Sequence, residues 1–165
     1  MAEKATSQEK VLEEFDLEKN VTVISISEGE TTFPRITTIG SVLIPPEGRM
    51  RLTRNEIISQ VQTGNHLLCG TGNGAHATLF IDDAPTRAYL GFDSEDGTVT
   101  QNVFSDAKVK EVFALKTQAA FEEACRNTFI SGDEKRALIR AIKRLKINDY
   151  ARIRFVEDYT GRQVM

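Results

Sequence analysis

A chain of 165 residues is long enough for one ordinary domain with a buried core of its own. Its hydrophobic fraction of 40% and charged fraction of 27% are typical of a folded protein, and its formal net charge is −3. The first residues lack the apolar segment of a secretory signal, and no apolar run approaches the length of a membrane span. We therefore expect neither secretion nor membrane insertion.

The N-terminal third predicts a tail, two strands and a helix. Residues 1–19 are polar and charged, which is typical of an exposed tail or of a short helix. Residues 20–27 are rich in β-branched side chains and alternate in polarity, which predicts a strand, and residues 36–44 predict a second one. A capping-box spacing at Thr53 then predicts a helix over residues 54–63.

The stretch from His66 to Ile81 contains both histidines and three glycines, with Asn73-Gly74 at its centre. Asn-Gly between apolar runs is typical of a type I′ turn, so we expect a hairpin of strands 66–69 and 77–81. The alternative is a phosphate-binding loop. That loop would need a helix after the glycines, whereas residues 77–81 have the pattern of a strand.

The same hairpin register defines a candidate pocket at Cys69 and His76. It places these two side chains on one face and His66 on the other. Cys69 and His76 could act as nucleophile and base, although the sequence indicates no carboxylate that would orient the imidazole. The simpler interpretation is a structural or surface histidine.

Further strands are predicted at residues 87–92 and 98–104, joined by short turns into an antiparallel meander. Acidic residues lie in the turns at opposite ends of strand 87–92, so they cannot easily converge on one metal ion. Cys69 and Cys125 fit no disulfide or metal spacing. We therefore expect no metal, no cofactor and two reduced thiols in a cytoplasmic protein.

The C-terminal part predicts mainly helices. Residues 109–115 fit a helix or a strand equally well, and residues 117–129 have helical periodicity. A capping box at Ser131 and Glu134 begins a helix over residues 132–147. Residues 151–156 alternate in polarity and predict a final strand, with the choice between helix and strand left open over 150–156.

This part is also basic. Residues 106–165 carry 13 basic and 9 acidic side chains, whereas residues 1–105 carry 8 and 15. Cations on the polar face of helix 132–147 and after it could neutralise phosphates of a nucleic acid. A solvated helix face is the alternative. The candidate residues are Arg136, Arg140, Lys143, Arg144, Arg152 and Arg154.

Together these patterns predict an α+β fold. We expect residues 20–165 to form one domain, with an antiparallel β-meander and about three packed helices, the last two in the C-terminal third. Because no convergent catalytic set is visible, we expect a non-catalytic binding or regulatory protein, such as a bacterial or phage accessory protein. Its partner would be another protein or a second copy of the chain. The alternatives are a nucleic-acid-binding protein and a nucleotide-binding or enzymatic protein using Cys69 and His76.

Overall fold

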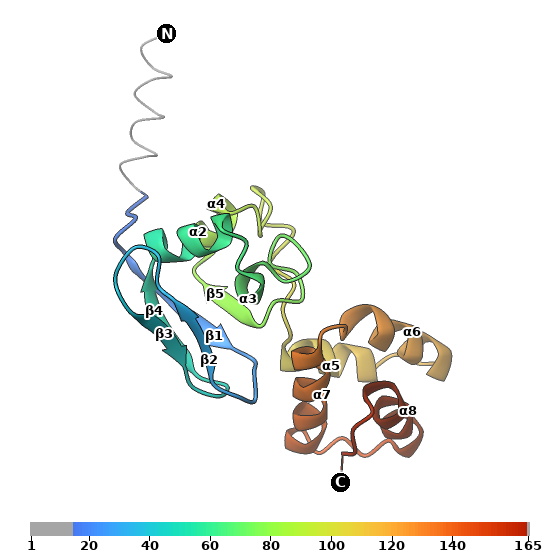
Figure 1. Ribbon diagram of the computed structural model, residues 1–165. Coiled ribbons are helices and arrows are strands. Elements are labelled where there is room, and N and C mark those ends of the chain that lie inside the picture. Colours follow the sequence, from blue (N-terminus) through green and yellow to red (C-terminus); the bar gives the residue numbers. More distant parts are fainter. Residues whose placement is uncertain (1–14, 165) are drawn as a thin grey trace.

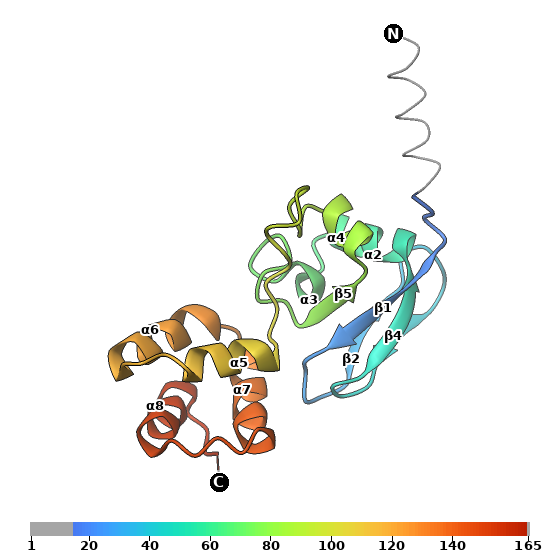
Figure 2. The same cartoon turned by 180° about the vertical axis from the view of Figure 1, so that it is seen from behind.

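The computed structural model describes residues 15–164, which form two lobes (Figure 1). The N-terminal lobe contains the strands and three short helices, and the C-terminal lobe contains helices only, as Figure 2 shows from behind. The elements of the first lobe are β1 (Asn20–Ser25), β2 (Thr31–Pro34), β3 (Ser41–Ile44), β4 (Arg49–Thr53), α2 (Arg54–Gln62), α3 (His66–Cys69), β5 (Leu79–Asp82) and α4 (Ala84–Tyr89). Those of the second are α5 (Asp106–Phe113), α6 (Gln118–Thr128), α7 (Gly132–Arg144) and α8 (Tyr150–Thr160).

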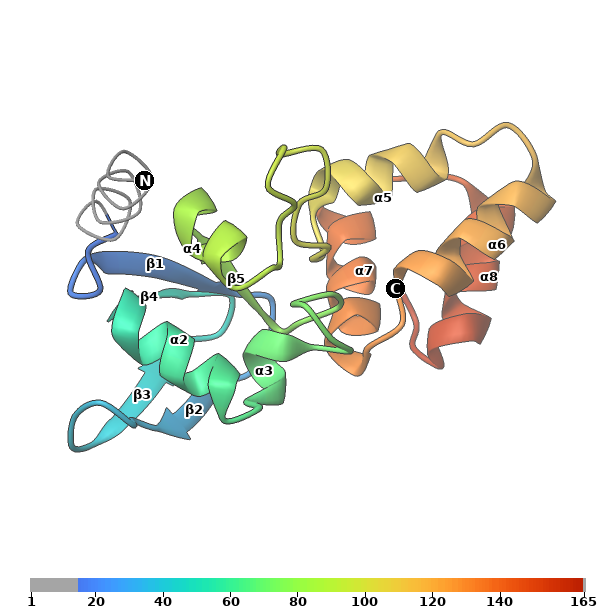
Figure 3. The same ribbon diagram turned by 90° about the horizontal axis from the view of Figure 1, so that it is seen from above.

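Two small antiparallel sheets build the first lobe. One has the strand order β4-β1-β5, and the other is the β2–β3 hairpin. Alternate residues of these strands face a shared core, which includes Val23, Phe33, Val42 and Leu52. Helices α2 and α3 lie beside the strands in the view from above (Figure 3), and their residues Ile57 and Leu68 complete this core.

The second lobe has a separate core. Phe121, Phe129, Leu138 and Ile142 are buried there among other apolar residues of α5 to α8. No residue belongs to both clusters, and polar contacts such as the Thr78–Asp133 hydrogen bond and the Glu47–Arg140 ion pair cross the junction between the lobes. None of the described helices combines the length and apolarity needed to cross a membrane.

The structure confirms the α+β class with antiparallel strands. Four predicted elements are confirmed with slightly shorter bounds: strand 20–27 and helices 54–63, 117–129 and 132–147. The ambiguous residues 109–115 fall mostly in helix α5. The predicted tail falls largely outside the described residues. The predicted strand 36–44 is wrong in its first half, because residues 36–40 form the bend of the β2–β3 hairpin and only residues 41–44 are extended, as β3. Strands β2 and β4 were not predicted.

The predicted hairpin over residues 66–81 is wrong in its first half. Residues 66–69 form helix α3, because the Asn65 side chain accepts a hydrogen bond from the Leu67 amide and caps a helical turn. Several left-handed residues, including Asn73 and His76, then form a compact loop instead of one two-residue turn. Only the second half is a strand, as β5.

The strands predicted at 87–92 and 98–104 are also wrong. Asp83 caps helix α4 by accepting from the Thr86 amide, and Pro85 fits the first turn, where its missing N–H costs nothing. Residues 98–104 form an irregular linker. Its Gln101 side chain reaches the free edge of β5, accepting from the Ile81 amide at 3.4 Å and donating to the Leu79 carbonyl at 3.5 Å.

The predicted final strand at 151–156 is helix α8. Asp149 caps this helix by accepting from the Arg152 amide at 3.2 Å. Arg152 and Val156, which are one helical turn apart, are both buried. A buried arginine counts as polar in an alternation pattern, and this produced the appearance of a strand.

Candidate functional site

The β2–β3 hairpin presents apolar side chains to solvent. Ile39 in its turn is 101% exposed, and Ile36 and Leu43 are 47% and 50% exposed. Single exposed apolar residues are ordinary on protein surfaces, whereas this hairpin carries three within residues 36–43. Residues 31–46 contain one charged side chain, Arg35, although 27% of the whole chain is charged. This low charge is typical of the centre of a protein–protein interface.

A buried carboxylate holds the turn of this hairpin. Glu56 of α2 is 1% exposed, and its two oxygens accept hydrogen bonds from the Ile36 amide at 2.8 Å and the Thr37 amide at 2.9 Å. The Thr37 hydroxyl donates to the same carboxylate. Gln60, one helical turn later, donates to Glu56 at 2.8 Å and to the Pro34 carbonyl at 2.8 Å. Helix α2 therefore fixes the backbone from which the isoleucines project.

The electrostatics of Glu56 agree with this role. Burial opposes the charged form, but the hydrogen bonds from Thr37, Gln60 and the Ile36 amide outweigh it and lower the pKa of Glu56 to about 2. The carboxylate is thus ionised at any physiological pH. The predicted capping box at Thr53 is half formed: the Thr53 hydroxyl accepts from the Glu56 amide, but the Glu56 side chain turns to the hairpin.

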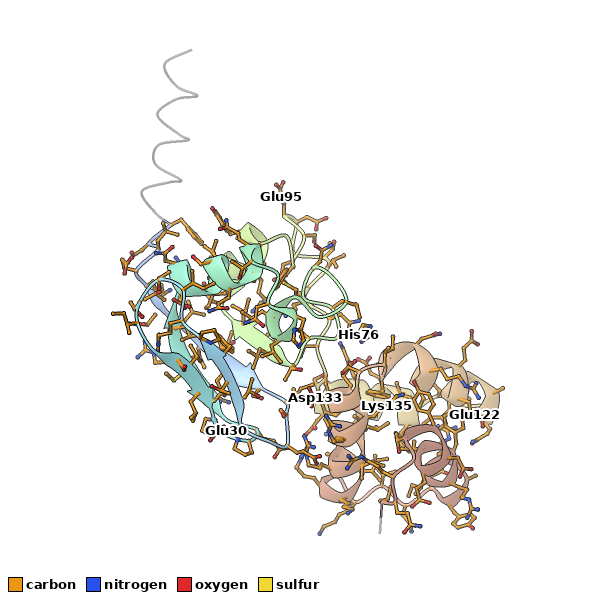
Figure 4. All side chains as sticks on the ribbon, viewed as in Figure 1. Glu30, His76, Glu95, Glu122, Asp133 and Lys135 are labelled. Atoms are coloured by element: carbon orange, nitrogen blue, oxygen red, sulfur yellow. The ribbon has the colours of Figure 1, made fainter. Side chains whose placement is uncertain are left out.

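Cys69 and His76 are held by different partners. The Cys69 thiol lies 3.7 Å from the Val61 carbonyl, and burial raises its pKa, which disfavours the reactive thiolate. The His76 Nδ1 atom lies 2.9 Å from Glu134 Oε1, at the junction of the lobes (Figure 4). The sequence indicated no carboxylate beside His76, and the structure supplies one from a residue 58 positions later in the chain.

Glu134 also forms the predicted capping box with Ser131, which is confirmed. Its carboxylate is 1% exposed and accepts from the Ser131 amide at 3.1 Å as well as facing His76. Next to it, Asp133 accepts from the Thr78 hydroxyl at 2.7 Å and pairs with Arg136. The first turn of α7 therefore joins the two lobes, and Figure 4 shows Asp133 on that side of the helix.

Most of the candidate basic residues take part in internal contacts. Arg136 and Arg140 reach acidic residues of the first lobe, with Arg140 Nε 2.6 Å from Glu47 and Arg136 Nε 3.3 Å from Glu28. Arg144 pairs with Asp106 of α5. Buried Arg152 donates to the carbonyls of Phe113 and Leu115 at the end of α5.

The remaining two basic candidates, Lys143 and Arg154, are exposed. Arg154 lies 3.9 Å from Asp158, and Lys143 forms no ion pair among residues 15–164. The six cations therefore do not form one free surface. Nucleic-acid binding by this part of the chain stays a prediction.

Sequence reasoning missed the hairpin residues Ile36, Ile39 and Leu43 and their support, Glu56. The stretch of low charge over residues 31–46 was the available signal. Within the described part of the chain, no group of three or more His, Cys, Asp and Glu side chains could hold a metal ion. Comparison of the chain with protein-family models, curated proteins and solved structures found no match.

Proposed function

We propose that this chain is a non-catalytic protein-binding module that inserts the turn of its β2–β3 hairpin into an apolar cleft of a partner protein. The observation that carries the proposal is the complete exposure of Ile39 on a turn that buried Glu56 holds in place. A rigid, apolar projection binds well because little conformational entropy is lost when it docks. A small number of buried apolar anchors usually supplies most of the binding energy.

Charge indicates what surrounds the cleft. Residues 31–46 contain no acidic side chain and one basic one, Arg35, and the neighbouring strand β4 exposes Arg49 and Arg51. Complementary charge at an interface rim favours the correct partner and speeds association. The expected partner is therefore a protein whose apolar cleft has an acidic rim. A cytoplasmic location of this complex stays a prediction.

The test compares Ile39→Asp with a matched control, Val99→Asp. Val99 is 61% exposed, but it lies in the linker before α5, away from the hairpin in sequence. A lysate of the native host is passed over the immobilised wild-type chain, and the proteins that it retains are identified. The affinity of each purified protein for the wild type and for both variants is then measured. We expect Val99→Asp to bind like the wild type, and Ile39→Asp to bind at least about tenfold more weakly because it buries an unpaired charge.

Two results would contradict the proposal. One is a partner that binds Ile39→Asp and the wild type with equal affinity. The other is a dimer of this chain, seen by light scattering, that Ile39→Asp dissociates, since a second copy would then occupy the hairpin. Because the Ile39 side chain is fully exposed, its substitution should leave the melting temperature unchanged. An unchanged melting temperature would exclude misfolding as the cause of weaker binding.

A further inference from the structure

A cavity of about 450 Å³ lies between the lobes, away from the hairpin turn. Its walls come from β1 and the residue after it, from β5, from α4, from the linker before α5, and from the first turn of α5. This volume is within the range of sites that bind small molecules.

The floor of the cavity is apolar. Ile24 of β1 and Phe80 of β5 are paired neighbours on the face of the sheet that points away from the first core. Ile26 continues this face, and Val103 and Phe104 of the linker also line the cavity. Because neither hydrophobic cluster includes Ile24, Ile26 or Phe80, an apolar ligand would bury surface that the fold leaves partly open.

Two cations line the same cavity, and they differ in their partners. Arg87 is neutralised: its Nε atom lies 3.0 Å from the Asp93 carboxylate, and its Nη1 atom donates to the Ile81 carbonyl at 2.8 Å. Lys108 is not neutralised in this way. Its ammonium donates to the neutral side-chain amide of Asn102 and forms no ion pair with any residue between 15 and 164.

The surroundings of Lys108 make its charge costly. Burial lowers the pKa of Lys108 below its ordinary value, and the more distant charges of Glu134 and Glu111 oppose that shift. A partly buried ammonium without a carboxylate partner is stabilised when an anion enters the same space. The cavity therefore combines an apolar floor with one cation that lacks a counter-ion.

We infer that this cavity binds a small carboxylic acid with an apolar body, whose carboxylate pairs with Lys108 while the body lies against Ile24, Ile26 and Phe80. Arg87, already paired with Asp93, forms part of the wall. The site is separate from the hairpin, so its occupation does not depend on the protein-binding function.

Calorimetric titration of the full chain with octanoate and with 4-phenylbutyrate tests this inference, with octanamide as the uncharged comparison. The variants are Lys108→Met, which keeps an apolar stem, Lys108→Arg, which keeps the charge, and Lys110→Met. Lys110 is a matched control because it lies on the same helix, is exposed and does not line the cavity.

We expect the wild type, Lys110→Met and Lys108→Arg to bind both carboxylates. Lys108→Met should bind them about ten- to a hundredfold more weakly, as expected for loss of a charge-assisted hydrogen bond. Octanamide should bind the wild type and Lys108→Met equally. Unchanged melting temperatures would show that the variants are folded.

Carboxylate binding that Lys108→Met leaves unchanged would overturn the inference, as would the absence of saturable binding to the wild type at millimolar concentrations. Failure here is distinguishable from failure of the proposed function. Ile39→Asp should bind both carboxylates normally, and Lys108→Met should bind the partner protein normally.

Discussion

Replacing Glu56 by glutamine should destabilise the protein and loosen the binding hairpin together. The carboxylate is 1% exposed and accepts two backbone hydrogen bonds of 2.8 and 2.9 Å from the turn. Its pKa falls from the ordinary 4.5 to about 2 on folding. Since one pKa unit corresponds to ~1.4 kcal/mol, the folded state favours the carboxylate by about 3 kcal/mol at neutral pH.

The direction of the pH dependence follows from this shift. Because the folded-state pKa of Glu56 is lowered to about 2, its contribution is complete above about pH 4.5 and is lost as the pH falls toward 2. The Glu56→Gln variant would lack this dependence, and its amide group would place N–H donors against the N–H donors of the turn. We expect the substitution to lower the free energy of unfolding at pH 7 by about 2–3 kcal/mol.

Urea denaturation at pH 7 and at several values between pH 2 and 5 measures both effects. For a chain of this length, the loss corresponds to a melting temperature roughly 5–10 °C lower. Exposed Glu95 forms no hydrogen bond through its side chain among the described residues, so Glu95→Gln is the control and should behave like the wild type. Asp83 and Asp133, whose pKa values are also lowered, leave the variant with part of the acid dependence. A Glu56→Gln variant within about 0.5 kcal/mol of the wild type at pH 7, or one whose stability falls as steeply as that of the wild type between pH 5 and 2, would refute the stabilising role of the carboxylate.

Two further predictions concern the lobe junction and the thiols. Glu134→Gln should lower the free energy of unfolding by about 1–3 kcal/mol, because the buried carboxylate accepts hydrogen bonds at the Ser131 cap and contacts His76. The control variant at an exposed position, Glu123→Gln, should unfold like the wild type. Equal urea midpoints for Glu134→Gln and the wild type would contradict this prediction. Burial raises the pKa of Cys125 to about 12, so Cys125 should react with a disulfide reagent only after unfolding. Labelling of native protein at Cys125, detected by mass spectrometry, would show that the second core opens.

Local sequence determined the elements whose signals are local. The Ser131 cap and the apolar stripe after it predict helix α7, because capping and periodicity depend on residues within a few turns of each other. The alternating β-branched residues of β1 predict a strand for the same reason. These features, the helices α2 and α6, and the α+β class follow from the sequence alone.

Where the local sequence was compatible with more than one backbone conformation, contacts with distant residues selected the observed one. Asn73-Gly74 permits a hairpin turn, but capping by Asn65 and the close approach of Gly74 to Phe92 and Gln101 select a compact loop. A Cβ atom on Gly74 would lie 2.6 Å from the Phe92 ring. Such a contact joins distant parts of the chain, so no window of sequence contains it.

The use of charged side chains also depends on the tertiary structure. The sequence places cations on one face of α7, but only the folded chain brings Arg140 to Glu47, so that this cation forms an intramolecular ion pair. Similarly, Glu56 has the spacing of a helix cap, yet the nearby turn of β2–β3 recruits its carboxylate. Side-chain type and spacing are written in the sequence, whereas the partner of a long side chain depends on which distant segment packs beside it.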